Sequence, residues 1–197
     1  RHMRSWMVCM WVIPVIGIVA AAPGELTLLN SEVWEVADGG NGNTYELWLE
    51  TSNWNTWEEA NAAANGMGGH LAALETAAEN EWVFANVAMP GFQGLWNGGI
   101  GPWLGGYQVE GSAEPLGGWY WVTGEPIDYD AWFEGEPNDQ AVDGENYLIY
   151  WSYWAGAQWN DYSATNFSSS YIVEYEVPAP ATLTLLLGAL ALRRRRR

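Results

Sequence analysis

The stretch "WYWVTGEPIDYDAWFEGEPND" (Trp119–Asp139) joins a short aromatic run to a long segment of acids, glycines and prolines. An aromatic run bounded by turn residues is typical of a short strand, and the residues that follow it indicate turns and a long loop. Three acids lie around Pro137, and "QWND" (Gln158–Asp161) supplies further carboxyl and carboxamide groups later in the chain. The sequence therefore gathers oxygen-bearing side chains at two places.

Upstream of this stretch, two segments have the pattern of helices. Each is predicted to begin with a capping box, formed by Thr56 with Glu59 and by Thr76 with Glu79. Gly66 to Gly69 are expected to end the first helix, and Pro90-Gly91 to end the second.

The strand signals are short and are separated by turns. "YELWLE" (Tyr45–Glu50) and "HLAAL" (His70–Leu74) are predicted strands. Short apolar pieces follow: "WLGGYQ", "WYWVTG", "YLIYW", "AQWND" and "YIVEYEV". Two helices, several short antiparallel strands and a long polar loop region predict an α+β domain.

Charge is distributed very unevenly along the chain. All seven basic residues lie at the ends, as Arg1, Arg4 and Arg193–Arg197, whereas all 24 acids lie between Glu25 and Glu176. Nucleic-acid binding needs cations to displace counterions from phosphates, so it is excluded, as are lysine- or arginine-based phosphate sites. Because self-repulsion destabilises so acidic a domain, we expect bound metal cations or a saline environment.

Both ends have the features of processing signals. Residues 1–23 show the basic, apolar, small-residue order of a secretory signal peptide, although a buried first helix is the alternative. Residues 178–197 resemble the bacterial PEP-CTERM sorting signal that an exosortase cuts, with Ala179 where that family has Glu. A membrane anchor is the alternative. These features predict an exported bacterial protein of the cell envelope or extracellular matrix, which contacts the membrane only through its terminal segments. The remaining domain covers residues 24–177 and has no disulfide, because the only cysteine is Cys9.

Between Asn30 and Val177, the order of motifs resembles the C-type lectin-like domain. The motifs that carry the resemblance are "TWEEA", "GGHLAAL", "AENEWV", "WLGGY", "WYWVTGEPIDYDAWFEGEPND", "ENYLIYW" and "AQWND". The resemblance implies a C-type lectin-like fold with a long calcium-binding loop region. It also implies that two family disulfides are replaced by apolar or aromatic residues, at Ala64 with Val173 and at Tyr147 with Ala164.

The resemblance further implies one calcium ion and names its ligands. The matching positions are Glu136, Asn138, Glu145, Asn160 and Asp161. Together they offer carboxylate and carboxamide oxygens, which Ca²⁺ accepts in sets of six to eight, whereas Mg²⁺ prefers a tighter octahedron rich in water. The absence of His and Cys from this set argues against zinc and copper. Pro137, between two of these positions, is cis in the family, and X–Pro bonds are the usual place for cis peptides.

In the family, two neighbouring hydroxyls of a sugar complete the calcium shell. The residues expected to bind both calcium and sugar are Glu136, Asn138, Glu145 and Asn160. The Glu-Pro-Asn order indicates mannose, glucose, N-acetylglucosamine or fucose type ligands, whereas galactose binders typically carry Gln-Pro-Asp. The competing interpretation is a solvated loop on an acidic protein.

A second calcium ion is a weaker expectation from the same resemblance. Asp139 and Asn146 occupy positions at which some members bind it. Ser112 and Leu116 stand where further acids are usual and cannot serve, so Glu110 or Glu114 would have to substitute after a loop shift.

Catalysis is not expected. No nucleophile and orienting acid can be assigned around His70, although Glu134 with Glu136, or Asp128 with Asp130, could form a glycosidase carboxylate pair. The sequence thus predicts a non-enzymatic protein that binds carbohydrate through calcium. Two alternatives remain open: a calcium-stabilised adhesive or structural protein-binding module, and a carboxylate-based glycoside hydrolase.

Overall fold

The computed structural model describes residues 26–50, 55–92 and 100–177. The expected signal peptide and sorting signal both lie outside these residues. Within the described ranges, no helix is both long enough and apolar enough to cross a membrane.

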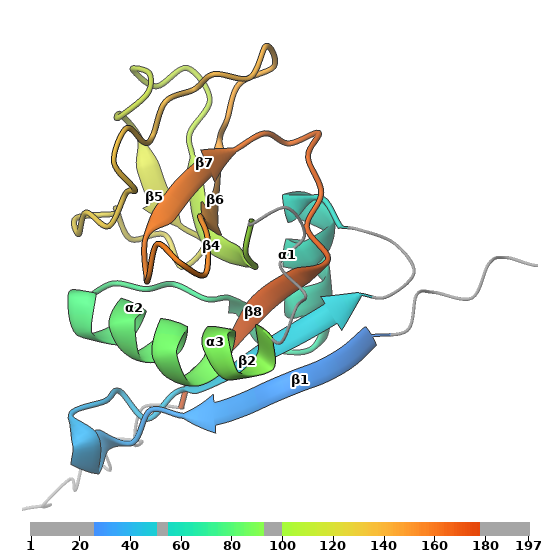
Figure 1. The fold of residues 1–197 in the computed structure, drawn as a ribbon, viewed down its shortest axis with the longest axis vertical. Helices are drawn as coiled ribbons and strands as arrows, with labels where there is room; N and C mark the ends of the chain where they lie inside the picture. Colours follow the sequence, from blue (N-terminus) through green and yellow to red (C-terminus); the bar gives the residue numbers. More distant parts are fainter. Residues whose placement is uncertain (1–25, 51–54, 93–99, 178–197) are drawn as a thin grey trace, which may run out of the picture.

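A single mixed sheet runs through the molecule (Figure 1). Its strand order is β1-β2-β8-β4-β6-β7, with β3 paired to β8 and β5 paired to β4. The strands are β1 (Leu26–Val33), β2 (Thr44–Glu50), β3 (His70–Leu71), β4 (Trp103–Gln108), β5 (Trp119–Trp121), β6 (Tyr147–Tyr150), β7 (Trp159–Tyr162) and β8 (Ser170–Tyr175).

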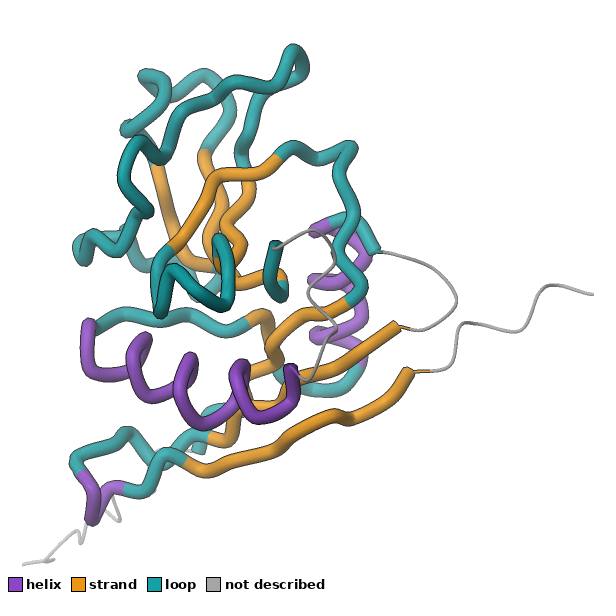
Figure 2. Tube along the Cα trace, in the orientation of Figure 1, coloured by secondary structure: helices purple, strands orange, loops and turns teal. Residues whose placement is uncertain are grey.

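The helices are short and lie in separate places beside the sheet, toward one end of the molecule (Figure 1). They are α1 (Trp57–Gly66), α2 (Ala77–Val83), a π-helical segment (Phe84–Ala88), α3 (Met89–Phe92) and a 3-10 turn (Val36–Asp38). Figure 2 shows that the opposite end, beyond β5, β6 and β7, consists of loops. The α+β prediction is confirmed.

One predicted capping box is complete and the other is half formed. At α1, Thr56 Oγ1 accepts the Glu59 N–H (3.3 Å), and the Glu59 carboxylate accepts the Thr56 N–H (3.0 Å). At α2, Thr76 accepts the Glu79 N–H (3.2 Å), but the Glu79 carboxylate accepts from the Glu75 N–H (2.8 Å) instead. The Glu79 carboxylate is drawn into the buried network described below.

The prediction that Pro90-Gly91 ends the second helix is wrong, because helical structure continues to Phe92. Proline normally breaks a helix because it lacks an N–H. Here a π-helical turn precedes it, in which the Met89 N–H reaches back to Phe84 O. Pro90 is then the second residue of α3, in a first helical turn where proline is tolerated.

All five short apolar pieces after residue 100 form strands, as predicted. Two features differ from expectation. The strand β1 was not predicted, and β4 and β8 pair in parallel through Trp103 and Tyr171. This parallel contact joins the two halves of the sheet.

Aromatic packing forms the core on one face of the sheet. Trp159 is fully buried and meets three other rings edge-on, those of Trp121 (5.6 Å), Tyr129 (5.3 Å) and Trp132 (5.9 Å). Such edge-to-face contacts add to the free energy gained by burying large rings. They attach the start of the long loop to β7.

The second core cluster contains three of the four positions at which the resemblance implied lost disulfides. Ala64 and Val173 are fully buried in it. Tyr147 stacks on Trp57 with ring centroids 4.5 Å apart. Packed side chains therefore occupy the places of the missing bridges.

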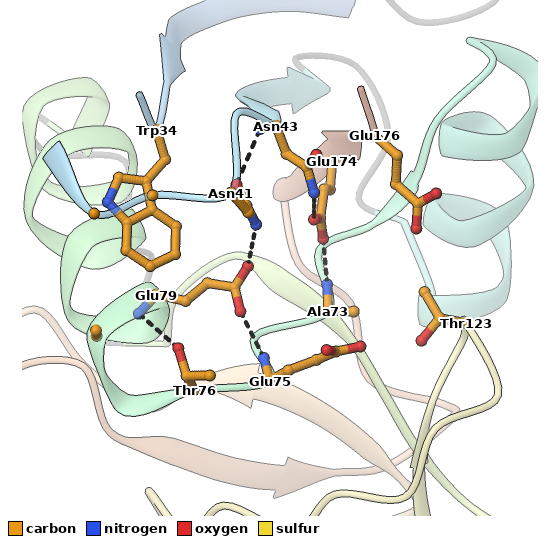
Figure 3. A pocket seen from close by; sticks show the side chains of 13 residues that line it. Trp34, Asn41, Asn43, Ala73, Glu75, Thr76, Glu79, Thr123, Glu174 and Glu176 are labelled. Carbon is orange, nitrogen blue, oxygen red and sulfur yellow. Dashed lines mark hydrogen bonds between the residues drawn. The ribbon is translucent and has the colours of Figure 1, made fainter. Parts of the chain in front are cut away.

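A buried network of polar groups joins β2, α2 and β8. The Tyr45 hydroxyl donates to Glu79 (2.5 Å) and lies 3.1 Å from the Glu174 carboxylate. Figure 3 shows Asn41 and Asn43 pointing toward these two acids from the segment before β2. The acids line a cavity of about 540 Å³.

Each carboxylate in this network has three donor groups within hydrogen-bond distance, and the two carboxylates share Tyr45. Glu174 accepts from the Ala73 N–H (2.9 Å), Asn43 (2.7 Å) and Tyr45. Burial is the main cause that raises the pKa of Glu174, and burial together with the negative charge of Glu174 also raises the pKa of Glu79. A hydroxyl has a single proton to donate, so the two acids compete for Tyr45.

These raised pKa values make stability depend on pH. A carboxyl whose pKa is higher in the folded protein stabilises it at low pH, and that contribution is lost as pH rises through the folded pKa. We expect Glu174→Gln to lower the free energy of unfolding by about 1–3 kcal/mol near pH 5, because a side-chain amide cannot accept all three bonds. Near pH 8 the loss should be smaller. At that pH the wild type carries a buried charge at Glu174 that destabilises it, and the glutamine variant does not.

Denaturant unfolding in chelator at both pH values measures this difference. Glu32→Gln is the matched control, because it removes the same charge from an exposed side chain on β1 that is not part of the network. Its effect should be the same at both pH values. A pH dependence of Glu174→Gln equal to that of the wild type would contradict the prediction.

Candidate functional site

The acidic loop begins with a tight turn between Phe133 and Glu136. The Glu136 N–H donates to Phe133 O (2.8 Å), and Gly135 adopts φ +98°, a conformation that glycine tolerates. The Glu136–Pro137 peptide bond is cis. The turn leaves the Glu136 side chain half-buried at the start of the candidate site.

Asp161 anchors this loop to the sheet. Its carboxylate is fully buried on β7 and accepts the backbone N–H groups of Asn138 (2.9 Å) and Asp139 (2.8 Å). Hydrogen bonds from backbone N–H groups stabilise an ionised carboxylate. One side chain thus fixes the position of two loop residues.

Further contacts connect the loop residues to one another. Asn138 Nδ2 donates to Glu136 Oε2, and Asn138 Oδ1 accepts the Gln140 N–H (2.9 Å). The same N–H also reaches the Glu145 carboxylate (2.8 Å), and the Glu145 N–H donates to Asp139 Oδ1 (3.0 Å). The loop therefore folds back so that its two ends meet.

The carboxylates at this site are close enough to affect one another. Burial, followed by the neighbouring carboxylates of Asp161 and Glu145, raises the pKa of Glu136 to about 7. Burial is also the main cause of the raised pKa of Glu145, with Asp161 and Asp139 contributing. With no cationic side chain in the domain, this negative charge has no compensating partner from lysine or arginine.

Asn160 lies beside this group on β7 and is almost fully buried. Its amide donates to the backbone carbonyl of Asp161 (2.5 Å). Of the five expected ligands, the structure brings Glu136, Asn138 and Asp161 into direct contact, and Glu145 into electrostatic contact. Asn160 is next to Asp161 in the chain, and its side chain donates to the Asp161 backbone carbonyl.

The oxygen donors of the site are a mixture of carboxylates and carboxamides, and its acids are not arranged around a single point. Across the described ranges, no three His, Cys, Asp or Glu side chains stand together in an arrangement that would hold a metal ion. The Asp161 carboxylate is already engaged by backbone N–H groups, and two of the five expected donors are carboxamides. All available donors are the hard oxygens that calcium prefers.

The two residues expected at a second calcium site make other contacts. Asp139 adopts a left-handed backbone conformation (φ +48°) and accepts from the Glu145 N–H. Asn146 donates to the Gln108 side chain (3.3 Å). Glu110 and Glu114 are exposed in the preceding hairpin region. Asp139 and Asn146 both lie beside Gly144, but among the described residues no hydrogen bond or ion pair brings Glu110 or Glu114 to them.

The residues considered for catalysis are dispersed or exposed. Glu134, Asp128 and Asp130 are exposed, and the Asp130 carboxylate accepts the Trp132 N–H (3.1 Å). His70 Nδ1 lies 2.9 Å from Leu71 O. These contacts are structural.

Sequence reasoning missed one contact that closes the site. Asp143 accepts from the hydroxyls of Ser163 (3.0 Å) and Thr165 (2.7 Å), which lower the pKa of its carboxyl. This contact ties the tip of the loop to the segment after β7. Hydroxyl residues are too common for their spacing to reveal such a pair.

Two relatives illustrate what this chain is similar to. It is 27% identical over 132 residues to ladderlectin of Oncorhynchus mykiss, a match that covers 66% of this chain and 62% of ladderlectin. It is 33% identical over 84 residues to the type-2 ice-structuring protein of Brachyopsis segaliensis, covering 43% of this chain and 41% of that protein. The chain thus spans less than two thirds of each.

Solved structures share the fold at low sequence identity. The carbohydrate-recognition domain of cow CD23 superposes with a TM-score of 0.53 at 20% identity, over 70% of this chain and 90% of that one. A calcium-independent type II antifreeze protein superposes with a TM-score of 0.52 at 23% identity, over 70% of this chain and 88% of that one. The predicted C-type lectin-like fold is therefore confirmed.

A family model, the lectin C-type domain, matches residues 53–173, which include both helices and every strand from β3 to β7. This match spans more than half of the chain. The chain therefore belongs to the C-type lectin domain family.

Proposed function

We propose that this protein binds carbohydrate through one calcium ion and performs no catalysis. The observation that carries the proposal is the group formed by Glu136, Asn138, Glu145 and Asp161. It holds several carboxylates near one another, with no lysine or arginine in the domain to compensate them. The family to which the chain belongs supports carbohydrate as the class of ligand.

The donor chemistry of this group fits calcium. Glu136, Asn138, Glu145, Asn160 and Asp161 would hold the ion through oxygen atoms. The pKa of Glu136, raised to about 7, reflects negative charge that a bound cation would stabilise. When bound, calcium supplies coordination positions for two neighbouring sugar hydroxyls.

The side chains of the group then distinguish among sugars. Ionised carboxylates accept hydrogen bonds from hydroxyl groups, whereas the Asn138 and Asn160 amides donate them. The Glu136-Pro137-Asn138 order supports mannose, glucose, N-acetylglucosamine or fucose type ligands, as in the family members it resembles.

The fold is also compatible with a function that needs no calcium. One similar structure is described as a calcium-independent type II antifreeze protein, and one relative as an ice-structuring protein. This likeness favours, as the second candidate, a structural or adhesive role without metal. The experiments below separate the two.

We further propose that the protein is exported and acts at a cell envelope or in an extracellular matrix. The signal-peptide pattern of residues 1–23 and the sorting-signal pattern of residues 178–197 support this location. Weak single sites gain avidity when many copies lie on one surface, so attachment would suit a lectin.

Calcium binding is tested by thermal unfolding and titration calorimetry. We expect the wild type to be stabilised by calcium, by about 2.7 kcal/mol at a concentration of 100 times Kd. Glu136→Gln combined with Asn138→Ala should weaken binding at this site by tenfold or more, since each factor of ten corresponds to about 1.4 kcal/mol.

Glu134→Gln is the matched control for this experiment. Glu134 lies in the same loop two residues earlier but is exposed, so its replacement should leave the calcium response unchanged. An identical calcium response of the double variant and the wild type would show that the site is wrongly assigned.

Sugar specificity is tested on a glycan array with calcium and with chelator. We expect binding to mannose-type glycans that is lost in chelator. Glu136→Gln combined with Asn138→Asp should weaken this binding and favour galactose-type glycans, because it exchanges the carboxylate and carboxamide at the two positions. If the wild type binds no glycan on the array under either condition, carbohydrate binding is refuted. Cleavage of a bound glycan would indicate a hydrolase.

A further inference from the structure

A group of aromatic residues lies at the surface beside the turn that leads to Glu136. It consists of Phe133, Trp151 and Trp154, and we refer to these three residues as the aromatic cluster. The Trp154 side chain is 62% exposed, and its neighbour Tyr153 is 49% exposed. Tryptophan is usually well buried, and six of the ten other tryptophans in the described residues are buried in the core. A tryptophan exposed beside further rings therefore indicates a binding surface.

Ring contacts and backbone hydrogen bonds fix the aromatic cluster in place. The Phe133 ring lies 5.7 Å from that of Trp151 and 5.6 Å, edge-on, from that of Trp154. The Phe133 N–H donates to Trp159 O (2.9 Å), and the Trp151 N–H donates to Gln158 O (2.9 Å). A platform held in this way costs little conformational entropy when it binds a ligand.

The aromatic cluster is connected to the candidate site through Phe133. Trp132 pairs with Trp159 through a parallel bridge, and both rings point into the core. Phe133, the next residue, donates its N–H to Trp159 O, so it lies beside β7 at the start of the turn that leads to Glu136. The carbonyl of Phe133 also accepts the N–H of Glu136. The cluster and the candidate sugar site are therefore neighbours.

The chemistry of the aromatic cluster suits a sugar ring. A pyranose presents a face of C–H groups that packs on an aromatic ring, and its hydroxyls remain at the edge for water or polar partners. The absence of Lys and Arg disfavours uronic or sulfated sugars.

We propose that the aromatic cluster is a second subsite, which stacks on a neutral pyranose linked to the sugar at the candidate calcium site. The natural ligand is then an oligosaccharide rather than a single sugar. This inference rests on the proposed function, because the first sugar must be held by Glu136 and its neighbours.

The test compares the affinity of short and long ligands by titration calorimetry in calcium. The probes are mannose and glucose together with their β-1,4-linked trisaccharides, mannotriose and cellotriose. We expect at least one trisaccharide to bind about tenfold or more tightly than its monosaccharide, which corresponds to about 1.4 kcal/mol. Trp154→Ala should reduce this ratio to nearly one, and Trp154→Phe should restore most of it.

Phe167→Ala is the matched control, because Phe167 is also 49% exposed but lies in the segment after β7, outside the aromatic cluster. It should leave the ratio unchanged. If the wild type binds both lengths equally, or if Trp154→Ala weakens both equally, the subsite is refuted while the proposed function stands. If Trp154→Ala abolishes self-association in sedimentation and leaves the ratio unchanged, the cluster is an interface between copies. Binding of no sugar at all would refute both proposals.

Discussion

Between Glu25 and Glu176 the chain provides acids but no lysine or arginine, so carboxylates that become buried must be satisfied by N–H and O–H donors. Glu174 shows the solution in the core, where a backbone N–H and an asparagine donate to it and the Tyr45 hydroxyl lies 3.1 Å away. Asp161 shows it at the loop, where backbone N–H groups do the same. Hydrogen-bond donors therefore stabilise the buried carboxylates that lysine or arginine would stabilise in less acidic proteins.

This constraint also explains why the acids differ in behaviour. Where donors are sufficient, as at Asp161, the carboxylate becomes a structural anchor. At Glu136 the surroundings consist largely of other carboxylates and one amide, and the pKa rises to about 7. The loop thus concentrates uncompensated charge at one point of a fold whose other buried acids are supplied with donors.

Much of the fold could be predicted from the sequence, because turn residues separate its short apolar strands and because Thr56 with Glu59 forms a local signal. The spacing of Glu136, Asn138 and Asp161 likewise pointed to residues that do meet. The network of Tyr45 and Glu174 could not be predicted, since its partners lie 129 residues apart and their residue types are common. The strand β1 was missed because its exposed and buried residues do not alternate cleanly.

The position of β8 between β2 and β4 has a consequence for the order in which the chain folds. The strands that come before it form two groups, β1 with β2 on one side and β4 to β7 on the other, and β8 is the strand that joins them. Because β8 is the last of the described strands in chain order, the sheet is incomplete until residues 170–175 pair with both groups. Pairing of β8 is therefore the step that joins the two groups of strands, because no other described strand pairs with both of them.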